Sequence, residues 1–253
     1  MVSNKTGSYE GMLAETVRFY GDKGDLVSGY LARPLGNGPY PGVVVVHEVF
    51  GLVEHTKEIT RKFAQHGYIA LAPDLYYREM PGGPNDDVLD GIRKSGGIPD
   101  ARVLQDLEGV VRTIQSVATW SGKIGSIGYC SGGRISLMFA CNTDSLSAAV
   151  DCYGGRVVTD ELTENQPKPV VDMVANLSCP LLGLFGESDQ NPSPEHVARL
   201  RQELEKHHKD FELQSYPPDT GHGFFGVYKP GYRQPAAVDG WQRIFDFFGK
   251  NLH

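Results

Sequence analysis

Basic charge is scarce in this chain of 253 residues. Its 24 Lys and Arg are outnumbered by 31 Asp and Glu, so the formal net charge is −7. Nucleic acids are bound by clustered basic side chains, and no such cluster interrupts the acidic balance. We therefore expect no nucleic-acid partner.

Long apolar runs are absent as well. Residues 1–16 contain no apolar stretch of signal-peptide length, and no later stretch approaches the length of a membrane span. We therefore expect a cytoplasmic protein with no membrane partner. The length suits one large domain with a substantial core. We expect a single domain over residues 1–253, in which residues 1–15 form an irregular N-terminal extension.

Cysteines are few, and none are paired at short spacing. The four cysteines include no C-x-x-C pair, which argues against the common zinc and thiol-redox motifs, and we expect neither a metal nor a cofactor. Cys141, Cys152 and Cys179 lie in or beside apolar stretches, as buried reduced cysteines do. Cys130 differs because it lies in a glycine-rich turn, and it needs a separate explanation.

Short apolar runs rich in β-branched residues alternate with segments of helical periodicity. The run at 42–47 is typical of a strand buried on both faces. Such patterns predict strands at 16–20, 26–32, 42–47, 68–72, 123–128, 148–152, 180–186 and 210–216, and helices at 54–66, 102–116, 134–141, 193–207 and 238–251. The alternation predicts an α/β fold with a mainly parallel central sheet, helices on both faces and an N-terminal β-hairpin.

Two segments rich in proline, glycine and polar residues interrupt this alternation. Residues 74–100 are predicted to form a long loop, and residues 154–178 to pass over the sheet edge or an active site. Long loops without secondary structure of their own are uncommon unless they serve a function.

The glycine-rich turn Gly128-Tyr129-Cys130-Ser131-Gly132-Gly133 stands between a predicted strand and a predicted helix. It matches the G-x-S-x-G nucleophile elbow with sulfur in place of oxygen, and its glycines avoid Cβ clashes at a sharp turn. The elbow lifts the nucleophile to a helix N-terminus, which favours both a thiolate and an oxyanion. Taken alone, the motif also fits a glycine-rich turn that carries a buried cysteine.

Two further residues favour the catalytic interpretation. Asp189 and His222 each follow a predicted strand, and the chain order Cys130, Asp189, His222 is the nucleophile–acid–histidine order of the α/β-hydrolase fold. His222 is predicted to carry the proton, and Asp189 to orient its ring. The alternatives are a turn or helix-capping aspartate and a histidine in a glycine-rich loop. Glu187 is a competing acid.

The segment His47-Glu48-Val49-Phe50-Gly51 follows a buried strand. In this fold such a segment supplies one backbone N–H of the oxyanion hole, and we predict that Val49 does so together with Ser131. Glu48 is unusual there, because a carboxylate next to an oxyanion hole destabilises an anionic intermediate. We therefore expect that the Glu48 side chain either moves away or is itself required for function. The alternative is a solvated glutamate at a strand end.

The sequence resembles the dienelactone hydrolase family (carboxymethylenebutenolidases) from about Val43 to the C-terminus. The matching segments are His47-Glu48-Val49-Phe50-Gly51, Ala72-Pro73-Asp74-Leu75-Tyr76-Tyr77-Arg78, Gly128-Tyr129-Cys130-Ser131-Gly132-Gly133, Gly186-Glu187-Ser188-Asp189 and Gly221-His222-Gly223-Phe224. The resemblance implies an α/β-hydrolase with a triad of Cys130, His222 and Asp189. It implies that Glu48 hydrogen-bonds the resting thiol until substrate displaces it. It also implies that Arg78 binds a substrate carboxylate, and we add Phe50 as a substrate-binding residue.

One departure from the family leaves the substrate open. The family has a second carboxylate-binding arginine after the catalytic histidine, whereas residues 223–230 contain none. Gly226 occupies its place, and Lys229 or Arg233 could compensate. We expect hydrolysis of a small ester or lactone through a thioester, by a monomer or small homo-oligomer. A general carboxylesterase on uncharged esters is favoured instead if Arg78 points away from the pocket. A non-catalytic ligand-binding protein is the third possibility.

Overall fold

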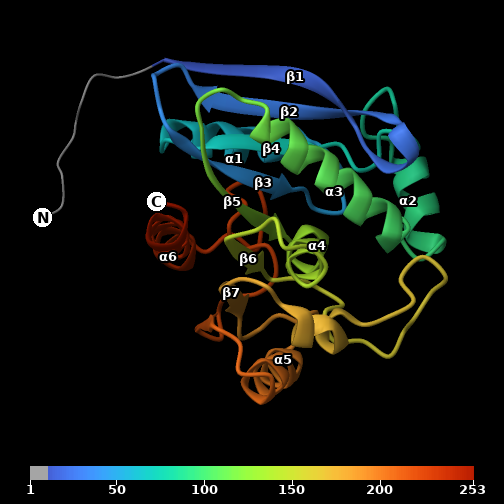
Figure 1. The fold of residues 1–253 in the computed structure, drawn as a ribbon. Coiled ribbons are helices and arrows are strands. Elements are labelled where there is room, and N and C mark those ends of the chain that lie inside the picture. The colour runs from blue at the N-terminus through green and yellow to red at the C-terminus, as the bar shows by residue number, and fades with distance from the viewer. Residues whose placement is uncertain (1–10) are drawn as a thin grey trace, which may run out of the picture.

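The computed structural model describes residues 11–253 and contains one eight-stranded sheet (Figure 1). The strands are β1 (Met12–Tyr20), β2 (Leu26–Pro34), β3 (Tyr40–Val46), β4 (Ile69–Pro73), β5 (Trp120–Tyr129), β6 (Ala148–Cys152), β7 (Leu181–Gly186) and β8 (Phe211–Tyr216). Their order across the sheet is β1-β2-β4-β3-β5-β6-β7-β8. Strands β3 to β8 run parallel, whereas β1 and β2 form an antiparallel hairpin whose second strand joins β4. The predicted sheet and hairpin are confirmed.

Helices cover both faces of the sheet, as the alternation predicted. They are α1 (Glu54–Gln65), α2 (Asp86–Lys94), α3 (Asp100–Gln115), α4 (Ser131–Ala140), α5 (Pro194–Lys206) and α6 (Gln234–Leu252). Strand β3 shows how the faces divide: Val43 and Val45 pack with α1 and α6, whereas Val44 and Val46 pack with α3 and α4. In residues 11–253, no helix is long and apolar enough to cross a membrane.

The structure corrects two boundaries. The predicted loop at 74–100 contains α2, which Asn85 caps by accepting a hydrogen bond from the Val88 N–H at 3.1 Å. The side chains of Leu89 and Ile92 are buried and form the inner face of this helix. Residues 12–15, predicted as irregular, belong to β1, and residues 1–10 of that predicted extension lie outside the described residues.

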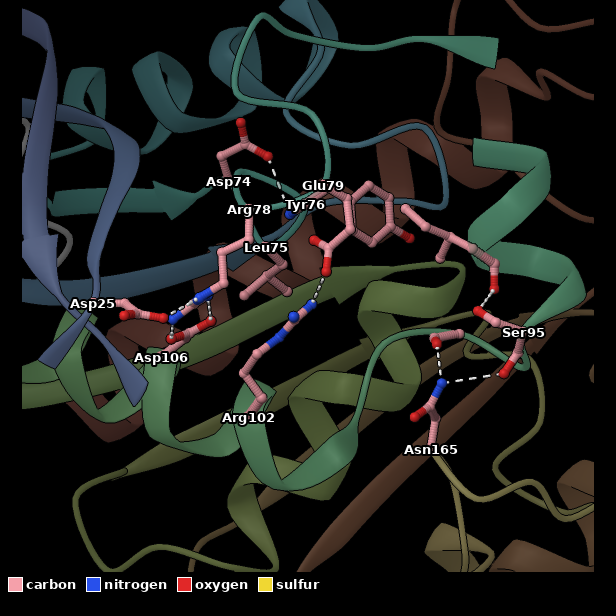
Figure 2. A network of polar contacts seen from close by, with 12 residues as sticks. Asp25, Asp74, Leu75, Tyr76, Arg78, Glu79, Ser95, Arg102, Asp106 and Asn165 are labelled. Carbon is pink, nitrogen blue, oxygen red and sulfur yellow. Dashed lines mark hydrogen bonds and ion pairs between the residues drawn. The ribbon is translucent and has the colours of Figure 1, made fainter. Parts of the chain in front are cut away.

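The predicted excursion at 154–178 packs against the end of α2. The side-chain amide of Asn165 donates to the carbonyl oxygens of Ser95 and Gly97 at 3.1 and 2.7 Å (Figure 2). Its own carbonyl accepts the N–H of Asp100 at 2.9 Å. A short 3₁₀ helix, Val170–Asn176, then leads the chain back toward β7. These contacts join the two segments into one structure beside the carboxyl ends of the strands.

Candidate active site

Cys130 occupies a strained turn between β5 and α4. Its backbone lies at φ 56° and ψ −123°, a conformation that residues with a Cβ rarely adopt. A Cβ on Gly128 would overlap the carbonyl of Gly132, and one on Gly132 would overlap the end of β3. The N–H of Cys130 donates to the carbonyl of Cys152 at 3.0 Å, which ties the turn to β6. The glycine pattern is therefore a steric requirement of this elbow.

His222 and Asp189 meet at the same edge of the sheet. His222 Nδ1 lies 2.7 Å from Asp189 Oδ2, and Asp189 is buried. The second carboxylate oxygen of Asp189 accepts the N–H of Asn191 at 2.9 Å, so the acid is held from both sides. Glu187, the competing acid, is exposed. The geometry thus favours Asp189 as the partner of His222.

The electrostatics of His222 favour its protonated form. Burial lowers the pKa of His222, but hydrogen bonds to Asp189 and to Cys130 outweigh burial and raise it to about 10. Because Nδ1 faces Asp189, Nε2 is left for the sulfur. A histidinium at this position stabilises a thiolate and holds a proton for a leaving group.

The backbone N–H groups of Val49 and Ser131 border the same cavity as Cys130. In the part of the chain that the structure describes, no protein acceptor takes either N–H. The cavity has a volume of about 370 Å³ and is also lined by Asp189 and His222. Two unpaired donors beside a thiol at a strand–helix elbow form the arrangement that an oxyanion hole needs.

His47 holds residues 47–51, here called the oxyanion loop after the predicted role of Val49, against the chain after β4, and the sequence did not predict this contact. Its Nδ1 donates to the Glu48 carbonyl at 2.7 Å, and its Nε2 accepts the N–H of Leu75 at 3.2 Å. Burial lowers the pKa of His47 to about 4, so the ring is neutral and one nitrogen can accept. The position of His47 in the sequence could have predicted this contact. A histidine directly after a buried strand lies within reach of its own loop and of the loop after the neighbouring strand.

Glu48 is buried, and its carboxylate is paired with Lys229. Lys229 Nζ lies 2.6 Å from Oε1 and 2.5 Å from Oε2, and the Tyr228 hydroxyl donates to Oε2 at 3.4 Å. Among the described residues, Glu48 makes no hydrogen bond to the thiol of Cys130. The resting contact that the resemblance implied is therefore replaced by an ion pair. Of the two candidate cations, Lys229 reaches the site, whereas Arg233 donates to backbone carbonyls.

Phe50 contacts the lysine of this ion pair at the protein surface. Lys229 Nζ lies 5.4 Å from the centre of the Phe50 ring, within the range of a cation–π contact. Phe50 is 39% exposed and lines a separate surface cavity together with Val227 and Tyr228. It therefore contacts Lys229 and does not line the cavity of Cys130 as a substrate-binding residue would.

Arg78 does not reach the cavity, and the structure corrects its predicted role. Its Nε lies 2.8 Å from Asp25, and Nη1 and Nη2 lie 2.8 and 3.0 Å from the two oxygens of Asp106 (Figure 2). Asp106 is fully buried and also accepts the N–H of Asp22 at 2.8 Å. Hydrogen bonds to Asp106 are the main cause that raises the pKa of Arg78. Arg78 therefore joins the N-terminal hairpin to α3. It does not line the cavity of Cys130, and its guanidinium is not free to bind a ligand there.

This structural role predicts a loss of stability in Asp106→Asn. Without the buried carboxylate, Arg78 keeps only the exposed Asp25 as a charged partner, so we expect the free energy of unfolding to fall by about 3 kcal/mol. Urea unfolding at pH 7 measures the change. Asp25→Asn is the matched control, because Asp25 is 56% exposed, and its expected cost is below about 1 kcal/mol. Equal losses in the two variants would contradict the assignment.

A second cavity adjoins the first. Its volume is about 520 Å³, and Val49, Ser131, Gly155 and Arg156 line both cavities. We call this larger cavity the side chamber; it lies between the α2 segment and the 154–178 excursion. Arg156 was missed in the sequence, where it appears as one polar residue in a long irregular segment.

Similarity to a known protein family covers the segments that form this site. The model of the dienelactone hydrolase family matches residues 27–252, a range that includes the elbow, Asp189 and His222. The chain belongs to the dienelactone hydrolase family. With that family it is an α/β-hydrolase and, by class, a hydrolase of carboxylic esters and lactones.

Relatives resemble this family member over nearly its whole length. Proteins of Salmonella typhimurium and Escherichia coli, both named "Putative carboxymethylenebutenolidase", are 37% and 39% identical to it. The first alignment covers 95% of this chain and 89% of the relative, and the second covers 89% and 83%. A crystal structure titled "Putative Dienelactone Hydrolase", from Klebsiella pneumoniae, matches with a TM-score of 0.87 at 33% identity, covering 95% of this chain and 99% of that one.

Proposed function

We propose that this family member hydrolyses a small ester or lactone through a thioester on Cys130. The observation that carries the proposal is that Cys130, Asp189 and His222 line one cavity, in which His222 Nδ1 lies 2.7 Å from Asp189 and leaves Nε2 for the sulfur. In this arrangement His222 transfers the proton, and Asp189 keeps the ring in the required tautomer and orientation.

The proposed reaction has two halves. The thiolate of Cys130 forms a bond to the carbonyl carbon, and the C=O electron pair moves to oxygen, where the N–H groups of Val49 and Ser131 bind it. When the carbonyl re-forms, the C–O bond breaks and His222 gives its proton to the departing alcohol or enol oxygen. Neutral His222 then takes a proton from water as the water oxygen attacks the thioester. Collapse of this second intermediate releases the acid and restores the thiolate.

Glu48 and Lys229 are proposed to act as a pair. A lone carboxylate beside the oxyanion loop would repel the developing negative charge, and Lys229 offsets that charge through both carboxylate oxygens. Contact between Glu48 and the thiol, as the family resemblance implies, requires Glu48 to leave Lys229.

A carboxylesterase on uncharged esters is the second candidate. It is favoured by the position of Arg78, whose donors are taken by Asp25 and Asp106. An anionic substrate therefore needs a different cation, and kinetics on matched charged and neutral esters separate the two candidates.

We further propose a cytoplasmic location and a small-molecule substrate. Four free thiols, at Cys130, Cys141, Cys152 and Cys179, support a reducing compartment. The cavity of about 370 Å³ around Cys130 supports a small ligand, because such ligands bind in concave sites of a few hundred Å³.

Trapping the thioester tests the proposed mechanism. With 4-nitrophenyl acetate we expect a burst of 4-nitrophenolate of about one equivalent, followed by slower turnover, because the good leaving group makes acylation faster than hydrolysis of the thioester. Acid quenching followed by peptide mass spectrometry should find the acetyl group on Cys130. Turnover without an acyl group on Cys130 would contradict the mechanism, and an acetyl group on another residue would assign the nucleophile elsewhere.

A further inference from the structure

The side chamber has apolar walls. Tyr76, Leu89, Ile92, Ile98 and Ile135 line it, and it opens to the cavity of Cys130 through the residues that the two cavities share. The two volumes, about 520 and 370 Å³, exceed what a small lactone needs. A ligand bound at Cys130 can therefore extend an apolar group into the side chamber.

The charged residues of the side chamber are mainly cationic. Arg93, Lys94, Arg134 and Arg156 line it, and Glu161 is the acidic residue among its lining side chains. Arg134 is neutralised by Asp100, with two contacts of 2.8 Å, and both groups are nearly buried. Arg93 and Lys94 lie at the end of α2, where Arg93 pairs with the exposed Asp90 at 2.9 Å. This distribution favours an anionic ligand.

Arg156 is the cation built into the wall between the two cavities. Its φ of 62° is a left-handed conformation, which costs a residue with a Cβ on the order of 1 kcal/mol. Its N–H donates to the side chain of Asn191 at 3.0 Å, and the N–H of Asn191 donates to Asp189 at 2.9 Å. The backbone of Arg156 is thus fixed to the loop that carries the triad acid.

The carboxylate partner of the Arg156 guanidinium is exposed. Nη1 lies 3.0 Å from the carboxylate of Glu161, whose side chain is 85% exposed, and Nε reaches Gln166 at 3.4 Å. Nη2 donates to the backbone carbonyl of Glu161 at 2.5 Å and so holds the guanidinium in place. Such an exposed pair contributes little in water. Arg78 differs, because its partner Asp106 is fully buried. A substrate carboxylate can therefore replace Glu161 at Arg156, whereas nothing replaces Asp106 at Arg78.

We propose that Arg156 is the specificity-determining residue of this enzyme and binds a carboxylate on an ester whose apolar part occupies the side chamber. The inference rests on the proposed function of Cys130. It names the substrate class as amphipathic esters that carry an anionic group, of which a monoester of an aryl-substituted dicarboxylic acid is an example. Arg156 then binds the substrate carboxylate. Arg78 cannot bind it, because its donors are taken by Asp25 and Asp106.

Paired kinetics test the assignment. For wild type and Arg156→Gln, kcat/KM is measured on the 4-nitrophenyl monoester of phenylsuccinic acid and on the same compound with its free carboxylate converted to a primary amide. We expect Arg156→Gln to lose about 10- to 100-fold on the anionic ester and less than about 3-fold on the amide, since a charge-assisted pair is lost. Arg156→Lys should recover part of the loss. Arg199→Gln, which removes an exposed charge on α5, is the control.

A binding experiment separates this inference from the proposed function. Cys130 is alkylated with iodoacetamide in the presence of 4-phenylbutyrate or 4-phenylbutanamide, and labelling is followed by peptide mass spectrometry without any ester turnover. We expect 4-phenylbutyrate to protect wild type more than the amide does, and Arg156→Gln to remove the difference. Equal protection by both compounds, or an anion preference that survives in Arg156→Gln, would overturn the inference. Selective protection in a protein that hydrolyses no ester would support it while rejecting the proposed function.

Discussion

Cys130→Ala is expected to lower kcat/KM for ester hydrolysis by about 10⁴-fold or more, because removal of a nucleophile leaves only binding and oxyanion stabilisation. None of the other three cysteines can take over, since all three are buried. Hydrolysis of 4-nitrophenyl acetate under pseudo-first-order conditions measures the loss. Cys179→Ala is the matched control: it removes a thiol outside the cavity and should retain wild-type kcat/KM. Activity that survives in Cys130→Ala would refute the thioester mechanism.

The same position makes a stability prediction that separates chemistry from folding. Alanine keeps the Cβ and therefore the strain of the positive φ, so Cys130→Ala should unfold at nearly the wild-type urea concentration. Cys130→Gly removes the Cβ and should be more stable than Cys130→Ala by about 1 kcal/mol, after the greater flexibility of unfolded glycine is counted. Both variants should be inactive. A less stable Cys130→Gly would show that the elbow carries no strain.

The features that the sequence predicted are those encoded locally. Buried parallel strands read as short apolar runs, and residues just past their carboxyl ends share one edge of the sheet, which is why Cys130, Asp189 and His222 were expected to converge. Helix α2 was missed because its proline- and glycine-rich flanks dominate the composition of residues 74–100. Its two buried residues, Leu89 and Ile92, are too few to show a clear periodicity.

The wrong predictions concern ion pairs between residues that are far apart in the sequence. Arg78 lies 53 residues from Asp25 and 28 from Asp106, and Glu48 lies 181 from Lys229, so nothing in the local sequence names these partners. A family motif transfers a residue type, but its role follows from the charges that surround it. In this chain Asp106 is buried next to Arg78, whereas the carboxylate that pairs with Arg156 belongs to an exposed glutamate.

Asp189→Asn is expected to lower kcat at neutral pH by about 10³- to 10⁴-fold, since an amide in place of the carboxylate favours the wrong tautomer of the histidine. The hydrogen bond to Asp189 helps to raise the pKa of His222 to about 10, so its loss lowers that pKa. Activity that depends on the histidinium is retained below this pKa and lost as the pH rises through it. The alkaline limb of the kcat/KM profile should therefore move to lower pH in Asp189→Asn.

Glu187→Gln is the matched control for this change, because it removes the competing carboxylate two residues away. Glu187 is exposed, so its loss should leave both kcat and the alkaline limb unchanged. The pH profile distinguishes a triad acid from a structural aspartate: a variant that merely loosens the loop around Asn191 loses activity at every pH without moving the limb. If Glu187→Gln shifted the limb and Asp189→Asn did not, the acid of the triad would be Glu187. The 2.7 Å contact between Asp189 and His222 predicts the opposite result.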